Sequence, residues 1–93
     1  MPVVATFDLP GVTEQQYLEA FRLVPELDGE EQEAGHLVHI GAPYEHGWRI
    51  VDVWESEEAF TAFAEQAGLA DCWRQVGVEF PSPRFFPVRH LER

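Results

Sequence analysis

The stretch from Gly47 to Phe60 holds the strongest structural signal in the chain. Its first nine residues, GWRIVDVWE, are rich in β-branched and aromatic side chains and predict a strand over 48–55. Ser56 follows as a helix N-cap, and Glu57 and Glu58 lie where the positive end of a helix favours acidic residues. A strand that passes directly into a capped helix is typical of a compact α/β or α+β fold.

The remaining signals complete a β-α-β-β-α-β order. Strands are predicted over 3–9, 36–42 and 84–91, and Pro87 favours an edge position for the last of these strands. Thr13 and Gln16 predict a capping box for the first helix, which Pro25 and Gly29 bound, before the charged connector 30–33. The second helix is expected to end at Gly68, and a shorter helical segment follows it. This order predicts one domain over 1–93 of the α+β class, a ferredoxin-like four-stranded antiparallel sheet with helices on one face.

The charge of the chain limits its partners. The formal net charge is -11, and the six basic residues are scattered arginines that form no stripe. We therefore expect neither nucleic acid nor a membrane surface as a partner. No apolar run approaches the roughly 18 residues that span a bilayer. A single cysteine, Cys72, and no secretory signal predict a cytoplasmic protein whose thiol is buried and inert.

Strand alternation divides the residues of the central hairpin into two sets. We expect the helices to cover the face with branched apolar side chains, which are Val38, Ile40, Val51 and Val53. The opposite face then carries Leu37, His39, Gly41, Trp48, Ile50, Asp52 and Trp54. A face this aromatic is not expected to remain in water. A second copy of the sheet would cover it, which predicts a homodimer with the two tryptophans, Phe85 and Phe86 near its seam.

Asp52 is the candidate catalytic residue, together with His39. If Ile40 lies opposite Val51, then His39 lies opposite Asp52 across the hairpin. A carboxylate in such a place can act as a general base or orient the imidazole. The alternative is a structural aspartate that accepts hydrogen bonds from an indole or an arginine. We expect a hydrogen-bonding partner for Asp52, with His39 first and Arg89 or Arg84 second.

The chain resembles a known superfamily at this point. The run from Trp48 to Phe60 and the closing Pro87-Val88-Arg89-His90-Leu91, together with the element order, are similar to the dimeric α/β-barrel superfamily. Within that superfamily the chain resembles the small proteins grouped with the antibiotic-biosynthesis monooxygenases. The resemblance implies a homodimer of facing sheets and a cavity between sheet and helices. It also implies, as one option, oxygenation of aromatic polyketide-like molecules without a metal or flavin; other branches bind haem, cyclise polyketides or serve in stress responses.

Two functions remain open from the sequence. In the first, a cofactor-independent enzyme acts on a small, mostly apolar aromatic molecule. In the second, the same cavity only binds a ligand, or the barrel is an accessory dimerisation module. Candidate substrate-binding residues are Phe7, Leu37, Trp48, Ile50 and Trp54. We expect no metal site, because His36 and His39 would point to opposite faces of a regular strand. A haem ligand from His39 or His90 is a weaker alternative.

Overall fold

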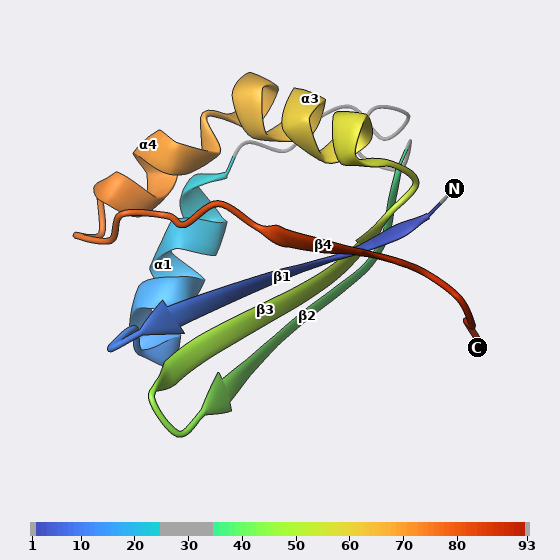
Figure 1. The fold of residues 1–93 in the computed structure, drawn as a ribbon. Helices are drawn as coiled ribbons and strands as arrows, with labels where there is room; N and C mark the ends of the chain where they lie inside the picture. Colours follow the sequence, from blue (N-terminus) through green and yellow to red (C-terminus); the bar gives the residue numbers. More distant parts are fainter. Residues whose placement is uncertain (1, 25–34, 93) are drawn as a thin grey trace.

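A computed structural model describes residues 2–24 and 35–92 of the chain. Seven elements follow one another along these residues: β1 (Val3–Pro10), α1 (Glu14–Leu23), β2 (His36–Tyr44), β3 (Gly47–Trp54), α3 (Glu57–Ala67), α4 (Leu69–Arg74) and β4 (Arg84–Pro87). The strands form one antiparallel sheet in the order β2-β3-β1-β4, and the helices lie on one side of it (Figure 1). The predicted ferredoxin-like α+β fold is confirmed.

The predicted helix starts are confirmed in detail. Thr13 and Gln16 form a reciprocal capping box at the start of α1. The Ser56 hydroxyl accepts a hydrogen bond from the backbone N–H of Ala59 at the start of α3. These two caps fix where each helix leaves its strand. The predicted end of the first helix at Pro25–Gly29 and the connector 30–33 lie outside the described residues.

The last strand is shorter than predicted. It ends at Pro87 rather than continuing to Leu91, and it pairs only with β1, at the edge of the sheet. The edge position that Pro87 predicts is therefore confirmed. The chain beyond β4 continues to residue 92 without a strand: Val88 still donates its backbone N–H to the Pro2 carbonyl at 3.0 Å, but the neighbouring strand β1 begins only at Val3.

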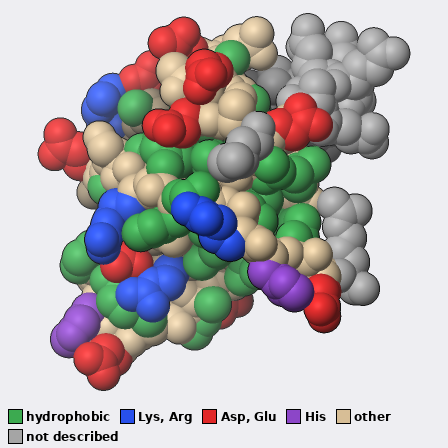
Figure 2. Space-filling view, turned by 45° about the vertical axis from the view of Figure 1, so that its right-hand side comes forward, with side chains coloured by type: hydrophobic (Ala, Val, Ile, Leu, Met, Phe, Trp, Pro, Cys, Tyr) green, Lys and Arg blue, Asp and Glu red, His purple; other side chains and the backbone are tan. Residues whose placement is uncertain are grey.

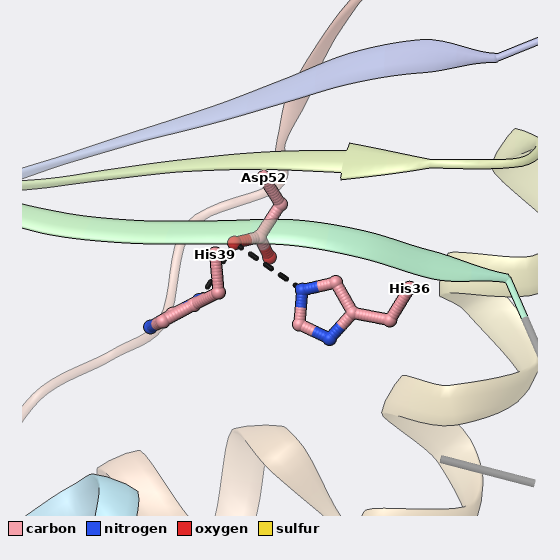
Figure 3. Close-up of side chains that lie close together, drawn as sticks. All are labelled: His36, His39 and Asp52. Atoms are coloured by element: carbon pink, nitrogen blue, oxygen red, sulfur yellow. Dashed lines mark hydrogen bonds and ion pairs between the residues drawn. The ribbon is translucent and has the colours of Figure 1, made fainter. Parts of the chain in front are cut away.

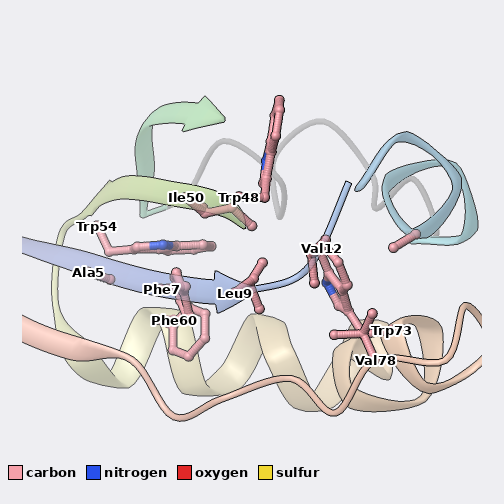
Figure 4. Packing of buried hydrophobic residues seen from close by; sticks show 11 residues of the cluster. Ala5, Phe7, Leu9, Val12, Trp48, Ile50, Trp54, Phe60, Trp73 and Val78 are labelled. Carbon is pink, nitrogen blue, oxygen red and sulfur yellow. The ribbon is translucent and has the colours of Figure 1, made fainter. Parts of the chain in front are cut away.

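The assignment of the two sheet faces was wrong. The side chains that pack against the helices include Phe7 of β1 and Trp48, Ile50 and Trp54 of β3, together with Phe60 of α3 and Trp73 of α4 (Figure 4). The branched set, Val38, Ile40, Val51 and Val53, lies on the opposite, helix-free face, where Ile40 is 51% exposed.

The physical reason lies in the helices. The helices that cover the sheet contribute the large rings of Phe60 and Trp73 and also small side chains: Ala20 and Ala67 are buried, and Ala59 and Ala64 are partly buried against the same cluster. The alanines leave volume in this cluster for Trp48 and Trp54 of the sheet, at positions where we expected valine.

None of the described helices is long and apolar enough to cross a membrane.

On the face shown in Figure 2, hydrophobic side chains form a broad patch with basic side chains set among them, although the chain as a whole is strongly acidic.

Candidate functional site

Asp52 is a buried carboxylate in the middle of β3. It is 5% exposed and is the one buried polar residue among the described part of the chain. The predicted register is confirmed, because Ile40 pairs with Val51 and His39 pairs with Asp52. Since Asp52 shares its face with the core tryptophans, it points toward the helices and not toward the helix-free side of the sheet.

His39 links this carboxylate to a tyrosine of α1. Its Nδ1 lies 2.7 Å from Asp52 Oδ1, and its Nε2 lies 2.5 Å from the Tyr17 hydroxyl. Burial and the nearby Asp52 charge raise the pKa of Tyr17, so the phenol keeps its proton and donates it to Nε2. The remaining ring proton is then on Nδ1 and is donated to Asp52. These three residues form a continuous hydrogen-bonded relay.

A glycine makes room for the tyrosine. A Cβ at Gly41 would lie 2.9 Å from the Tyr17 ring and 3.0 Å from its oxygen, which is closer than side chains normally pack. Because Gly41 lies two residues beyond His39 on the same strand face, its bare backbone lets Tyr17 reach the imidazole. The Tyr17 and His39 rings stack with an interplanar angle of 9°.

His36 approaches Asp52 from the other side, which corrects the prediction that His36 and His39 point to opposite faces. The ladder pairs His36 with Trp54 and Val38 with Val53, so Leu37 is an extra residue in β2. This bulge reverses the alternation and brings both histidines to the helix side (Figure 3). His36 Nε2 lies 3.6 Å from Asp52 Oδ1, and its ring stacks on Trp54 at 4.2 Å.

The partners of Asp52 are therefore partly those predicted. His39 is confirmed as the first partner, and the indole N–H of Trp54 donates to Oδ2 at 3.3 Å. Among the described residues, the expected second partner is replaced by His36, since Arg84 and Arg89 are both exposed. Burial acts to raise the pKa of Asp52, but the two imidazoles outweigh it and hold that pKa below its usual value.

A cavity of about 600 Å³ opens between the sheet and the helices, next to these residues. Its walls are mostly aromatic and aliphatic, and its polar groups include those of the relay. The lining residues are Phe7, Tyr17, Leu18, Phe21, Arg22, Val24, His36, His39, Ile50, Asp52, Phe60, Phe63, Leu69, Trp73 and Phe80. A cavity of this size, with a few convergent polar groups, is typical of a site for a small ligand.

The predicted substrate-binding residues divide into two groups. Phe7 and Ile50 line the cavity, whereas Trp48 and Trp54 lie in the surrounding core and Leu37 lies at the bulge, none of them in the cavity wall. Tyr17 and His36, which also belong to this site, are not predicted as site residues from the sequence. Tyr17 shows the same helical spacing as any apolar stripe residue, and the orientation of His36 depends on a bulge that no local pattern marks.

Other candidate groups lie away from this site. His90 is exposed and lies 3.0 Å from Glu92, so it does not reach the cavity as a haem ligand would. His46 pairs with Glu45 in the hairpin turn. Cys72 is buried, as predicted, and burial raises the pKa of its thiol.

The comparisons with known proteins support the fold. No protein-family model and no curated protein matches the chain. Among solved structures, the chain is similar to SnoaB, a cofactor-independent oxygenase from Streptomyces nogalater, with a TM-score of 0.60 and 15% identity over 97% of this chain and 93% of SnoaB. A mutant of SnoaB gives the same TM-score at 16% identity.

A second oxygenase has the same fold. The monooxygenase from the gene ActVA-Orf6 of Streptomyces coelicolor, solved in complex with nanaomycin D, matches with a TM-score of 0.51 and 20% identity over 99% of this chain and 89% of that chain. The fold that the sequence resemblance implies is thus confirmed.

Proposed function

We propose that this chain is a monooxygenase-like enzyme that binds a flat, mostly apolar phenolic molecule in the cavity between sheet and helices. The observation that carries the proposal is the Tyr17–His39–Asp52 relay at the wall of that cavity. The fold shared with two oxygenases of Streptomyces adds support. A cavity closed by large side chains would have favoured a binding module, whereas this cavity is open and contains the converging polar groups.

The relay has the chemistry of a proton acceptor. The Tyr17 oxygen can accept a proton from a bound phenol while Tyr17 passes its own proton to His39 Nε2. The imidazolium that forms is stabilised by Asp52 at 2.7 Å. The resulting phenolate is electron-rich at its ring carbons, so it can react with O₂. One oxygen atom then enters the ring as a quinone carbonyl, and the other leaves as water.

The cavity walls match such a substrate. Phe7, Phe60 and Phe80 line it as a cluster of mutually packed aromatic rings, and Ile50 lies two residues before Asp52 on the same face of β3. Arg22 adds a single cation to the lining residues, suited to a carboxylate or a second phenolate on the substrate.

We also propose a homodimer, formed through the helix-free face of the sheet and not through the tryptophan face. Val38, Val53, Val4 and Phe86 pair in one continuous apolar row across all four strands on that face. Such a row is a surface that a second copy could cover. The proposal includes a cytoplasmic protein, because a reducing compartment suits the free thiol of Cys72.

The experiment that tests the proposed function follows binding and turnover separately. Nanaomycin D serves as a binding probe by thermal shift, and a panel of polycyclic phenols is incubated with the protein under ¹⁸O₂ and analysed by mass spectrometry. We expect a raised melting temperature and the incorporation of one labelled atom per product. Binding without any labelled product across the panel would instead support the binding-module alternative. The absence of both binding and labelled product would contradict the proposal.

Variants locate the chemistry in the relay. Tyr17→Phe and Asp52→Asn each remove one link while keeping the side-chain shape, so turnover should fall by about 10²-fold or more. Ligand binding should persist, because the apolar walls are intact. Tyr44→Phe is the matched control, since Tyr44 ends β2 at the hairpin and is not in the cavity wall. A loss of turnover in the control, or none in the relay variants, would rule out the assigned roles.

A further inference from the structure

Three potential metal ligands converge at the cavity wall. His36, His39 and Asp52 each offer one ligating atom, and these three atoms lie within 4.8 Å of one another (Figure 3). This is the one such group found among residues 2–24 and 35–92. His39 Nδ1 and His36 Nε2 lie 2.7 and 3.6 Å from Asp52 Oδ1. Ligands that share one tetrahedral zinc ion are about 3.3 Å apart, because each lies about 2.0–2.1 Å from the ion. The two distances that involve Asp52 Oδ1 bracket that value.

The relay described above leaves one of these atoms unused. His36 Nε2 is fully buried and makes no hydrogen bond. Asp52 Oδ1, at 3.6 Å, is too far for a hydrogen bond, and a buried ring nitrogen without a hydrogen bond is costly, so its retention requires an explanation. Nε2 faces a carboxylate that already receives bonds from His39 and Trp54. A cation placed between the three residues would give this nitrogen a partner.

Each of the three side chains is held in place by a neighbour. His36 stacks flat on Trp54, with an interplanar angle of 3°. The Trp54 indole N–H holds the second oxygen of Asp52, and the Tyr17 hydroxyl holds the far nitrogen of His39. Metal sites depend on such outer partners to fix the orientation of their ligands. The three residues are therefore arranged before any ion arrives.

We propose that His36, His39 and Asp52 form a binding site for a divalent transition metal ion. Two imidazoles and one carboxylate suit zinc, iron(II), cobalt or nickel, whereas magnesium and calcium prefer all-oxygen ligands. All three residues line the cavity. The coordination positions of the ion that no protein atom fills would therefore face a molecule bound in the cavity. The site is thus of the open, three-ligand kind.

The ion and the relay proton exclude each other. Coordination by His39 Nδ1 requires that nitrogen to lose its proton, which then resides on Nε2 and is donated to the Tyr17 oxygen. The site shares His39 and Asp52 with the relay, but metal binding also needs His36 and needs no substrate. Metal binding can therefore fail while the oxygenase proposal stands, and the reverse also holds.

The test is zinc binding by the whole protein after chelator treatment. Calorimetric titration with ZnCl₂ should give one ion per chain, and MgCl₂ should not compete. His36→Phe keeps a ring stacked on Trp54 but removes the ligating nitrogen, so zinc affinity should fall at least tenfold. His46→Ala and His90→Ala, which remove exposed histidines outside the cluster, should bind as the original chain does. Circular dichroism establishes that each variant is folded.

A second measurement needs no variant. In ¹⁵N NMR spectra of the original chain, zinc should shift the ring nitrogens of His36 and His39 and leave those of His46 and His90 in place. Four results would each overturn the proposal. They are an unchanged zinc affinity in His36→Phe, a loss of affinity in the His46→Ala and His90→Ala variants as large as that in His36→Phe, NMR shifts confined to His46 and His90, and the absence of saturable binding.

Discussion

A buried aspartate such as Asp52 needs hydrogen-bonding or ion-pair partners. Three ring nitrogens surround its carboxylate. His39 and Trp54 hold its two oxygens, and His36 faces it at 3.6 Å. All three partners come from β2 and β3 themselves, so the two strands build the polar centre without help from an arginine. The carboxylate is thereby charged in an apolar setting, which is the condition for stabilising a neighbouring imidazolium.

Cys72 is the residue whose burial can be tested most directly. Its Sγ contacts the backbone carbonyls of Leu23 and Ala67, and burial together with the nearby Asp71 raises the pKa of the thiol. Because only the thiolate reacts, a raised pKa leaves less of it at pH 8. We therefore expect Ellman's reagent to modify the native protein at least about tenfold more slowly than it modifies glutathione at pH 8.

The same protein in urea is the control, since its single cysteine should then react at the rate of the free thiol. The native rate should also rise as the pH is raised through the range where the thiol ionises. Native and unfolded protein reacting equally fast at pH 8 would show that Cys72 is accessible.

At the scale of the elements, the join between Gly35 and β2 positions His36. Gly35 has a φ of +112°, and a Cβ there would lie 2.8 Å from the Cβ of Ala59 in α3. The backbone N–H of Glu55 donates to the Gly35 carbonyl at 2.7 Å, which holds the start of β2 against the end of β3. The entry to β2 therefore tolerates no side chain.

Gly35→Ala should lower the free energy of unfolding by about 2 kcal/mol or more, because it combines backbone strain with a steric clash. The matched control is Gly11→Ala, which also has a positive φ but meets no atom within 4 Å. It should cost about 1 kcal/mol, the cost of placing a Cβ in the left-handed region. Urea unfolding followed by circular dichroism measures both values, and equal losses in the two variants would contradict the clash.

The sequence predicted these elements well because their signals are local. The capping residues Thr13 and Ser56, the breaker Gly68 and the alternation in β3 each depend on a few neighbours in the chain. The register that pairs His39 with Asp52 also followed, since it needs only the short turn of one hairpin.

What the sequence did not predict depends on distant contacts. Which face of β3 the helices cover is decided by the combined large and small side chains of α1, α3 and α4, a packing match between separate elements. The bulge at Leu37 reverses the direction of His36, and no residue type marks it. Tyr17 joins the site only because Gly41 leaves space for its ring. Half of the candidate site therefore became visible only in three dimensions.

At the scale of the whole molecule, the sheet has one covered face and one helix-free face. On the helix-free face, the apolar row from Val38 to Phe86 is followed by a second row in which Ile40 and Val51 meet Thr6 and Arg84. Beyond them lies the Asp8–Arg49 ion pair, with Nε and Oδ1 2.6 Å apart. An apolar strip bordered by charges is the composition expected of an interface core and its rim.

The homodimer proposed for this face makes a prediction about association. Ile40 is half exposed, so Ile40→Glu should leave the single chain folded while it places a charge in the apolar strip of both copies. Sedimentation at micromolar concentration should show a dimer for the original chain and a monomer for this variant. Ala62→Glu adds the same charge to an exposed position of α3 and should remain dimeric. Because each copy carries a formal net charge of -11, added salt should also tighten the original dimer by screening repulsion. A monomer for the original chain at every salt concentration would refute the proposed interface.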